Sequence, residues 1–435
     1  MRSAGDVAVD VVDGVVGEAS DGVVGGAPGA ALDEAADGPA AAARAVAAAL
    51  PAARTAAPPA TGAWREGDPV GRRRFADVGD LPLQLGGVLP QVRLAYETWG
   101  TLAPDGSNAV LVEHALTGDS HVLGDAGDGH PTPGWWPELV GPGRALDTDR
   151  FFVVAANVLG GCQGSTGPAT RRPGSVRPWG SAFPRITVAD QVAAEARLAD
   201  HLGIARFVAV LGGSMGGMRS LEWAAAQPGR VGAALVLATC PASTADQIGA
   251  QSAQITAVVS DPGWCGGDYH DLPDGQGPHT GLGLARRLAH LSYRSPAELD
   301  ARFGRLAQPG EDPLAPERPG RFAVQSYLDH HAAKLVRRFD AGSYVALTDA
   351  LNTWDVGLGR GGTDAALAAI TVPMVVAAVD SDRLYPVADS ERTAASPATV
   401  GGLRLITSTA GHDGFLVEAE QIAPLVREVL ALGAR

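Results

Sequence analysis

The sequence is poor in cysteine, lysine and aromatic residues, and it contains no long apolar run. Its three cysteines, Cys162, Cys240 and Cys265, are odd in number and far apart, which argues against a disulfide framework or a paired-cysteine metal site. Arginine supplies almost all of the positive charge, since Lys334 is the only lysine. No segment reaches the ~20 apolar residues that a membrane-spanning helix needs. The net charge of −14 argues against a nucleic-acid or anionic-membrane partner.

Residues 1–63 differ from the rest of the chain in composition. They consist mainly of Ala, Gly, Val and acidic residues and contain no aromatic side chain. They lack the basic start and compact apolar core of a secretory signal peptide, so we expect a cytoplasmic protein. We predict that this stretch is a disordered low-complexity tail and that the folded sequence begins near Trp64.

The remaining chain alternates between strand-like and helical segments. Thr187–His201, for example, reads as a helix that starts with a capping box at Thr187 and Asp190 and stops at Gly203. Such alternation predicts an α/β fold, with a mostly parallel central sheet flanked by helices. The expected strands are Asn108–His114, Phe151–Asn157, Arg206–Leu211, Ala233–Ala238, Val372–Val379 and Leu403–Thr407.

One interval breaks this rhythm, because no convincing strand lies between Cys240 and about Thr371. Its helix-like stretches are Ala245–Val259, Leu282–Leu291, Ser326–Phe339 and Ala341–Thr353. We interpret residues 241–370 as an all-helical lid inserted into a core made of residues 64–240 and 371–435.

A single serine lies between glycine pairs in "VAVLGGSMGGMRSLEWA", where an apolar strand pattern changes into a helical one. Glycine tolerates close backbone approach and positive φ, as a very tight strand-to-helix turn requires. The motif Gly212-x-Ser214-x-Gly216 is therefore a candidate nucleophile elbow that exposes the Ser214 hydroxyl above the sheet. The alternative is a glycine-rich loop that only connects the strand to the helix. Whether Ser214 is catalytic therefore depends on whether the chain also supplies a base and an acid for it.

Two later strands are followed by groups that would complete a catalytic triad. Asp380 and Asp382 follow Val372–Val379, and His412 follows Leu403–Thr407. The chain order Ser, Asp, His is the order that α/β-hydrolases use. We predict Ser214 as nucleophile, His412 as base and Asp382 as the acid that orients it, with Asp380 as the alternative acid.

The stretch "VLVEHALTGDSH" stands where an oxyanion hole is expected. The backbone N–H groups of Leu116 and Met215 would face the acyl oxygen. We interpret His114 as a structural histidine that hydrogen-bonds this loop. No metal site is expected, since His330-His331 lacks a third ligand at suitable spacing.

Several stretches together resemble homoserine O-acetyltransferases, from about Leu81 to the C-terminus. They include "LAYETWGTLAPDGSNAVLVEHALTGDSHV", "LGGSMGGMRSLEWA", "LARRLAHLSYRS" and "AGHDGFL". The resemblance implies an α/β-hydrolase fold with a helical lid and a homodimer paired through the lids. It also implies acetyl transfer from acetyl-CoA, as co-substrate, to L-homoserine, giving O-acetyl-L-homoserine for methionine biosynthesis, without a permanently bound cofactor.

The resemblance also assigns substrate-binding roles. Arg286 and Asp413 match substrate-binding residues of the family, and Tyr293 lies about two helical turns from Arg286. A guanidinium suits the carboxylate of homoserine and a carboxylate suits its ammonium group, which agrees with both roles. The register that uses Arg287 instead stays open.

Three alternative functions also stay open. They are a homoserine O-succinyltransferase or serine O-acyltransferase of the same fold, an esterase with the same triad, and a non-catalytic binding protein. The arginines of "RRPGSVRPWGSAFPR" (Arg171, Arg172, Arg177 and Arg185) either meet the nucleotide of coenzyme A or belong to a solvated loop.

Overall fold

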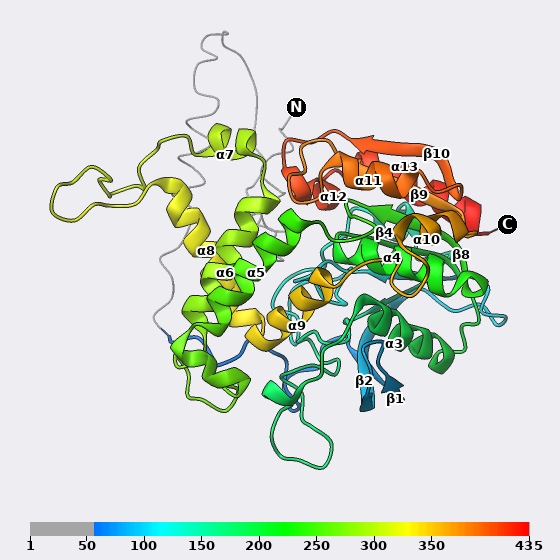
Figure 1. The fold of residues 1–435 in the computed structure, drawn as a ribbon, viewed down its shortest axis with the longest axis horizontal. Coiled ribbons are helices and arrows are strands. Elements are labelled where there is room, and N and C mark those ends of the chain that lie inside the picture. Colours follow the sequence, from blue (N-terminus) through cyan, green and yellow to red (C-terminus); the bar gives the residue numbers. More distant parts are fainter. Residues whose placement is uncertain (1–55, 435) are drawn as a thin grey trace, which may run out of the picture.

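A computed structural model describes residues 56–434 of the chain (Figure 1). Most of the predicted tail lies outside the described residues, but its last eight residues are placed and partly buried. The Thr61 hydroxyl donates a hydrogen bond of 2.8 Å to Asp340 Oδ1, and Ala60 and Ala63 are buried. The prediction that folded sequence begins near Trp64 is therefore wrong for residues 56–63, whose small side chains pack closely on the helical part.

An eight-stranded sheet forms the centre of the molecule, in the order β1-β2-β6-β3-β7-β8-β9-β10. β1 pairs antiparallel with β2, and β2 pairs antiparallel with β6, whereas the other neighbours are parallel. The strands are β1 (Arg74–Pro82), β2 (Val88–Trp99), β3 (Ala109–Glu113), β6 (Phe152–Ala156), β7 (Phe207–Gly213), β8 (Val231–Leu237), β9 (Met374–Val379) and β10 (Thr399–Ile406). A separate parallel pair consists of β4 (Val140–Gly141) and β5 (Leu146–Asp147).

All six expected strands are present, and the two antiparallel strands were not predicted. The central strands are apolar and buried along their whole length, so they stand out in the sequence. β2 mixes apolar residues with Gln91, Arg93 and Glu97, and β1 is exposed at half of its positions, so neither gives a clear signal. The sheet is therefore mostly, but not wholly, parallel.

Helices cover both faces of the sheet, and each face has its own apolar cluster. Leu111, Val210 and Val236 point toward one cluster, and their neighbours Val110, Leu211 and Leu235 point toward the other. The first cluster includes α3 (Val188–His201), α4 (Met215–Ala226) and α10 (Thr363–Ala369), and the second includes α12 (Gly414–Val417) and α13 (Ala419–Gly433). α11 (Val387–Ala394) packs on β9 and β10.

The helix predicted over Thr187–His201 corresponds to α3, which has the expected capping box. Thr187 Oγ1 accepts from the backbone N–H of Asp190, whose carboxylate accepts from the N–H of Thr187. This reciprocal arrangement satisfies two N–H groups that the helix itself leaves free.

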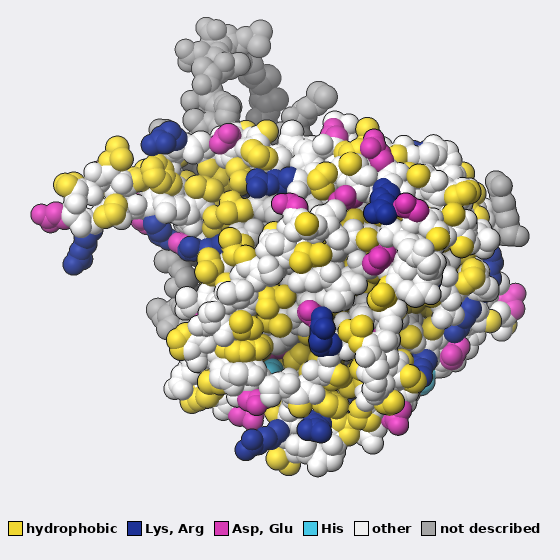
Figure 2. Space-filling view, in the orientation of Figure 1, with side chains coloured by type: hydrophobic (Ala, Val, Ile, Leu, Met, Phe, Trp, Pro, Cys, Tyr) yellow, Lys and Arg dark blue, Asp and Glu magenta, His cyan; other side chains and the backbone are white. Residues whose placement is uncertain are grey.

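The chain between β8 and β9 is helical, and most of it forms a separate layer at one end of the sheet (Figure 1). Its helices are α5 (Ala245–Val259), α6 (His279–Tyr293), α7 (Pro296–Arg302), α8 (Ala323–Arg338) and α9 (Ala341–Asn352), with a 3₁₀ segment η3 (Pro262–Gly267). α6 packs on both α5 and α8. Apolar side chains are exposed on the face over these helices (Figure 2). The four expected helical stretches correspond to α5, α6, α8 and α9, while the action of this layer as a lid stays a prediction.

Among residues 56–434, every helix is too short or too polar to cross a lipid bilayer.

Candidate active site

Ser214 lies at a sharp turn between β7 and α4. Its φ of 59° and ψ of −125° are unusual for a residue with a side chain. The turn packs against the end of β3, where a Cβ on Gly216 would lie 2.2 Å from the carbonyl oxygen of Glu113. A Cβ on Gly212 would lie 2.7 Å from the same oxygen. Only glycine fits at these two positions, so the motif has the geometry of a nucleophile elbow.

His412 and Asp382 form a buried pair beside this turn. The Nδ1 atom of His412 lies 2.6 Å from Asp382 Oδ2. Asp382 Oδ1 accepts hydrogen bonds from the N–H groups of Leu384 and Tyr385, which fix the carboxylate. The hydrogen bond to Asp382 places the proton of a neutral His412 on Nδ1 and leaves a lone pair on Nε2. His412 therefore has the tautomer that a general base needs.

Asp380, the alternative acid, is an exposed residue that directly follows β9. Its Oδ1 accepts from the N–H of Ser408, so it joins the segments that follow β9 and β10. The structure thus places Asp382, and not Asp380, against the imidazole.

Aromatic rings link His412 to the serine turn. The Phe415 ring lies 5.2 Å from the His412 ring and also lies against Gly213, whose Cβ would come within 2.3 Å of it. The rings of Tyr385 and Tyr293 lie 5.2 and 5.8 Å from that of His412. Among the hydrogen bonds of the described residues, none joins Ser214 to His412, and such contacts are often longer before substrate binds. Tyr385 and Phe415 were not identified from the sequence, although each stands within three residues of a predicted triad member.

The loop after β3 is held in place by the ring of His114. Its Nε2 accepts from the N–H of Val158 at 3.1 Å, so the proton is on Nδ1, which donates to the carbonyl oxygen of Ala115 at 2.7 Å. Burial, together with the nearby charge of Arg219, lowers the pKa of His114 to about 3. The ring is therefore neutral and structural, as the sequence interpretation has it.

The backbone N–H groups of both candidate oxyanion donors, Leu116 and Met215, are available for hydrogen bonding to a substrate oxygen. Met215 is the first residue of α4, so its N–H lies before the hydrogen bonds of the helix begin. The loop hydrogen bonds of the described residues include none donated by Leu116. Leu116 also borders a small crevice with His114, Asn157 and Val158.

Arg286 and Tyr293 of α6 lie on the side of this helix that faces His412. The guanidinium carbon of Arg286 lies 5.5 Å from the centre of the Tyr293 ring, which in turn contacts the His412 ring. Arg286 is fully buried. Arg287, the alternative, is half exposed and forms an ion pair with Asp329 of α8. The packing of α6 thus directs Arg286 toward the site and Arg287 away from it.

Asp413 is buried beside His412 and is ion-paired with a residue that the sequence interpretation missed. Its Oδ2 lies 2.9 Å from Nη2 of Arg294, and Nη1 of Arg294 lies 3.1 Å from Glu298. Burial raises the pKa of Asp413, while the positive charge of Arg294 opposes this. Arg294 stands in the quoted stretch "LARRLAHLSYRS", but its partner is far away in sequence. A substrate ammonium group would therefore meet a carboxylate that already has one cationic partner.

Comparison with known proteins adds to this geometry. A family model described as the alpha/beta hydrolase fold matches residues 108–419. The chain is 60% identical over 374 residues to the homoserine O-acetyltransferase of Thermobifida fusca, covering 86% of this chain and 97% of that protein. It is 54% identical to the homoserine O-acetyltransferase of Clavibacter michiganensis, with 86% and 96% covered. The chain belongs to the homoserine O-acetyltransferase family.

Solved structures confirm the α/β-hydrolase fold. Esterase E22 matches with a TM-score of 0.74 at 26% identity, over 82% of this chain and 99% of that protein. A homoserine O-acetyltransferase from Bacillus anthracis also has a TM-score of 0.74, at 24% identity, over 82% and 97%. Because an esterase and a transferase match equally well, the fold alone does not separate the two activities. The sequence relationship places the chain among the homoserine O-acetyltransferases.

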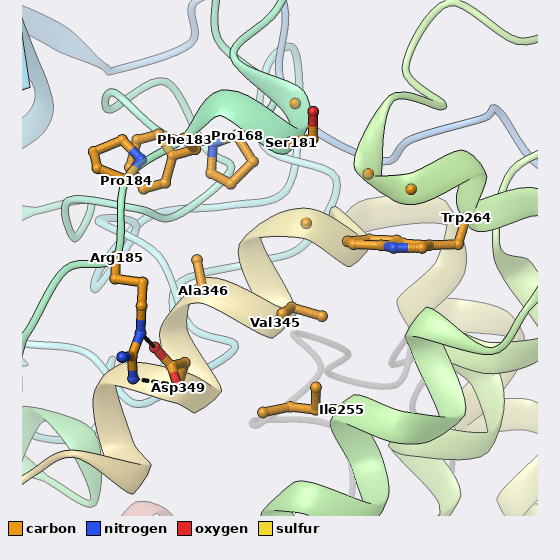
Figure 3. Close-up of a pocket in the computed structure, with 14 residues that line it drawn as sticks. Pro168, Ser181, Phe183, Pro184, Arg185, Ile255, Trp264, Val345, Ala346 and Asp349 are labelled. Atoms are coloured by element: carbon orange, nitrogen blue, oxygen red, sulfur yellow. Dashed lines mark hydrogen bonds and ion pairs between the residues drawn. The ribbon is translucent and has the colours of Figure 1, made fainter.

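This member of the homoserine O-acetyltransferase family also has a pocket of about 350 Å³ that contains none of the predicted site residues (Figure 3). Val345 and Ala346 border it, whereas Leu347, the next residue of α9, borders the crevice at Leu116. At its edge Arg185 makes two hydrogen bonds to Asp349, of 2.8 and 3.0 Å. Arg185 is thus already paired with a carboxylate, which weakens its attraction for a phosphate of coenzyme A.

Glu97, His121 and His130 form a buried cluster near the loop after β3 that the sequence interpretation did not group. His121 Nδ1 lies 3.0 Å from Glu97, and the N–H of Arg72 donates to His130 Nε2. The two imidazole rings stack 3.9 Å apart at an angle of 11°. One ligand atom of each residue lies within 4.8 Å of the others, but Nδ1 of His121 and Nε2 of His130 are already taken up by the contacts with Glu97 and Arg72. We therefore interpret the cluster as a hydrogen-bond network.

Proposed function

We propose that this chain transfers the acetyl group of acetyl-CoA to the hydroxyl of L-homoserine through an acetyl ester on Ser214. The observation that carries the proposal is the arrangement around His412. Its Nδ1 bonds Asp382, the ring of Tyr293 lies between it and buried Arg286, and buried Asp413 is the next residue. The family relationship supports the same activity. The product, O-acetyl-L-homoserine, is an intermediate for methionine biosynthesis, which is cytoplasmic chemistry.

In the first half-reaction, His412 Nε2 takes the proton of Ser214 while Oγ attacks the thioester carbonyl of acetyl-CoA. The oxyanion that forms accepts hydrogen bonds from the N–H groups of Leu116 and Met215. His412 then returns the proton to the leaving sulfur, and coenzyme A departs as the thiol. Asp382 holds the imidazole and stabilises its cation throughout.

In the second half-reaction, His412 removes the proton of the homoserine hydroxyl, which attacks the acetyl ester. Collapse of the second tetrahedral intermediate releases O-acetyl-L-homoserine and returns the proton to Ser214. Arg286 binds the carboxylate of homoserine, and Asp413, shared with Arg294, binds its ammonium group. Ser214 and His412 are both buried, which favours a positioned hydroxyl over water.

The helical layer supports a further proposal, namely a homodimer paired through the lids. α6 exposes a stripe of leucines, Leu284, Leu288 and Leu291, at helical spacing, and α5 exposes Ile248 nearby. Apolar side chains grouped on one face are typical of a protein–protein contact.

An esterase activity is the second candidate, because esterase E22 shares the fold. Thiol release from acetyl-CoA and from succinyl-CoA, each with L-homoserine, L-serine or no acceptor, separates the candidates. We expect fast release only with acetyl-CoA and L-homoserine. Equal release without acceptor would indicate a hydrolase. Mass spectrometry should show one acetyl adduct on the wild type mixed with acetyl-CoA and none on Ser214→Ala.

A further inference from the structure

Arg219 of α4 is a fully buried arginine that the proposed mechanism does not use. Its Nη1 lies 2.6 Å from Glu195 of α3 and 2.5 Å from Glu113 at the end of β3. Its Nη2 donates a hydrogen bond of 2.5 Å to the carbonyl oxygen of His114. One guanidinium thus connects the serine helix, the neighbouring helix, the central strand and the first residue of the oxyanion loop.

These contacts bear on the position of Leu116. The ring of His114 already ties the loop to Ala115 and Val158, and Arg219 ties the backbone of His114 from the other side. Glu113, the second partner of Arg219, also forms the surface on which Gly212 and Gly216 of the serine turn pack. Arg219 and its partner Glu113 therefore contact both the serine turn and the start of the loop that carries the Leu116 N–H.

The charges in this cluster do not balance if all three groups are ionised. Glu113, Glu195 and Arg219 are all buried, so two carboxylates facing one guanidinium would leave an uncompensated negative charge. Burial, together with its neighbour Glu195, raises the pKa of Glu113 well above its ordinary range. Glu195 instead accepts hydrogen bonds from Arg219 and from the indole N–H of Trp223. Burial thus favours the neutral form of Glu113, whose Oε2 lies 2.5 Å from Nη1 of Arg219.

We infer that Arg219, clamped by Glu113 and Glu195, is a positioning residue that holds the Leu116 N–H in register with Ser214. The inference rests on the proposed acetyl-enzyme chemistry. It goes further by giving a function to a buried charge cluster and by distinguishing its two glutamates through their contacts, since Glu195 accepts hydrogen bonds from both Arg219 and Trp223.

Two nearly isosteric variants test it, with p-nitrophenyl acetate as the acyl donor, water as a slow acceptor and the release of nitrophenol as the readout. Glu195→Gln removes the charge that orients Arg219, so we expect kcat to fall roughly 10²-fold, as for loss of one oxyanion donor, with little change in KM. Glu113→Gln keeps a neutral group that donates and accepts in the same way. We therefore expect its kcat to stay roughly tenfold or more above that of Glu195→Gln.

Glu222→Gln is the matched control for stability. Glu222 lies on the same helix and is buried, and it pairs with Arg360 through bonds of 2.8 and 2.5 Å, away from the oxyanion loop. This variant should lower Tm without lowering kcat. If Glu195→Gln does not fold, Arg219→Lys is the second variant. Lysine keeps the buried charge but does not reach all three partners at once, so the kcat of this variant should also fall.

Two results would overturn the inference. One is a Glu195→Gln or Arg219→Lys variant whose Tm falls like that of Glu222→Gln while kcat is unchanged. The other is equal loss of kcat in Glu113→Gln and Glu195→Gln. p-Nitrophenyl acetate contains neither coenzyme A nor homoserine, so this test succeeds or fails independently of the proposed acceptor.

Discussion

His412 Nδ1 and Asp382 Oδ2 lie 2.6 Å apart, and two backbone N–H groups hold the other oxygen of the carboxylate. Asp380, only two residues away, instead accepts a hydrogen bond from the backbone N–H of Ser408, which follows β10. This difference predicts opposite consequences for two conservative substitutions.

Asp382→Asn should lower kcat by roughly 10⁴-fold, by analogy with the serine-protease triad, because an amide favours the wrong imidazole tautomer. Asp380→Asn should change kcat little, since it affects only a part-buried hydrogen bond from the N–H of Ser408 and no contact of His412. Steady-state thiol release with acetyl-CoA and L-homoserine measures both. A large loss of kcat in Asp380→Asn, together with normal kcat in Asp382→Asn, would show that Asp380 is the triad acid.

The limits of sequence prediction can be seen at these same residues. The central strands were predictable because they are apolar and buried on both faces along their whole length. The choice between Asp380 and Asp382 was not, because it depends on the direction of each side chain in an irregular turn. Likewise, Arg286 and Arg287 are neighbours, and only the packing of α6 on α5 and α8 decides which of them is buried.

Ion pairs between residues that are far apart in the chain could not be predicted from the sequence either. Asp413 could be matched to a motif, but its pairing with Arg294 requires the end of α6 to lie against the His412 loop. That contact is tight, since a Cβ on Gly411 would lie 2.6 Å from the carbonyl oxygen of Tyr293. The contacts of Arg219 could not be predicted either, because its partners come from two other segments of the chain, Glu113-His114 and Glu195.

The two half-reactions should separate the proposed roles of Arg286 and the triad. Arg286→Ala should acetylate Ser214 at a near-normal rate from acetyl-CoA alone, because Arg286 is proposed to bind only the acceptor. It should then transfer the acetyl group to L-homoserine slowly, since an unpaired buried carboxylate costs about 2–5 kcal/mol. Single-turnover kinetics measure the two steps. Slow acetylation with normal transfer would mean that Arg286 serves coenzyme A instead.

Asp413→Asn should combine a binding defect with a stability defect. It removes a carboxylate that compensates the buried Arg294, so Tm should fall as well as the rate of the second half-reaction. The rate of Ser214 acetylation, measured on the same sample, shows whether the neighbouring His412 is intact. An unchanged Tm would contradict the importance of the Arg294 pair.

The exposed leucines of α6 predict a dimer interface, and a charged substitution at one of them should disrupt it. Leu288→Glu should shift the protein from dimer to monomer in sedimentation velocity, because a carboxylate in an apolar contact loses its hydration. Val176→Glu is the matched control, since Val176 is highly exposed but lies outside the helical layer. A wild-type monomer, or equal dissociation of both variants, would argue against pairing through α6.

The buried His114 predicts a specific dependence of stability on pH. Its pKa in the folded protein is about 3, mainly because of burial, whereas in the unfolded chain it is near the ordinary 6.5. Between these values the unfolded chain binds a proton that the folded protein does not, so this contribution is complete above 6.5 and is lost as pH falls. The stability advantage of wild type over His114→Gln should therefore shrink by about 1.4 kcal/mol per pH unit as pH falls below 6.5. Urea unfolding at several pH values measures it, and His201→Gln, at an exposed histidine in the last turn of α3, is the control. An advantage that stays constant with pH for His114→Gln would mean that this ring is not held neutral by the fold.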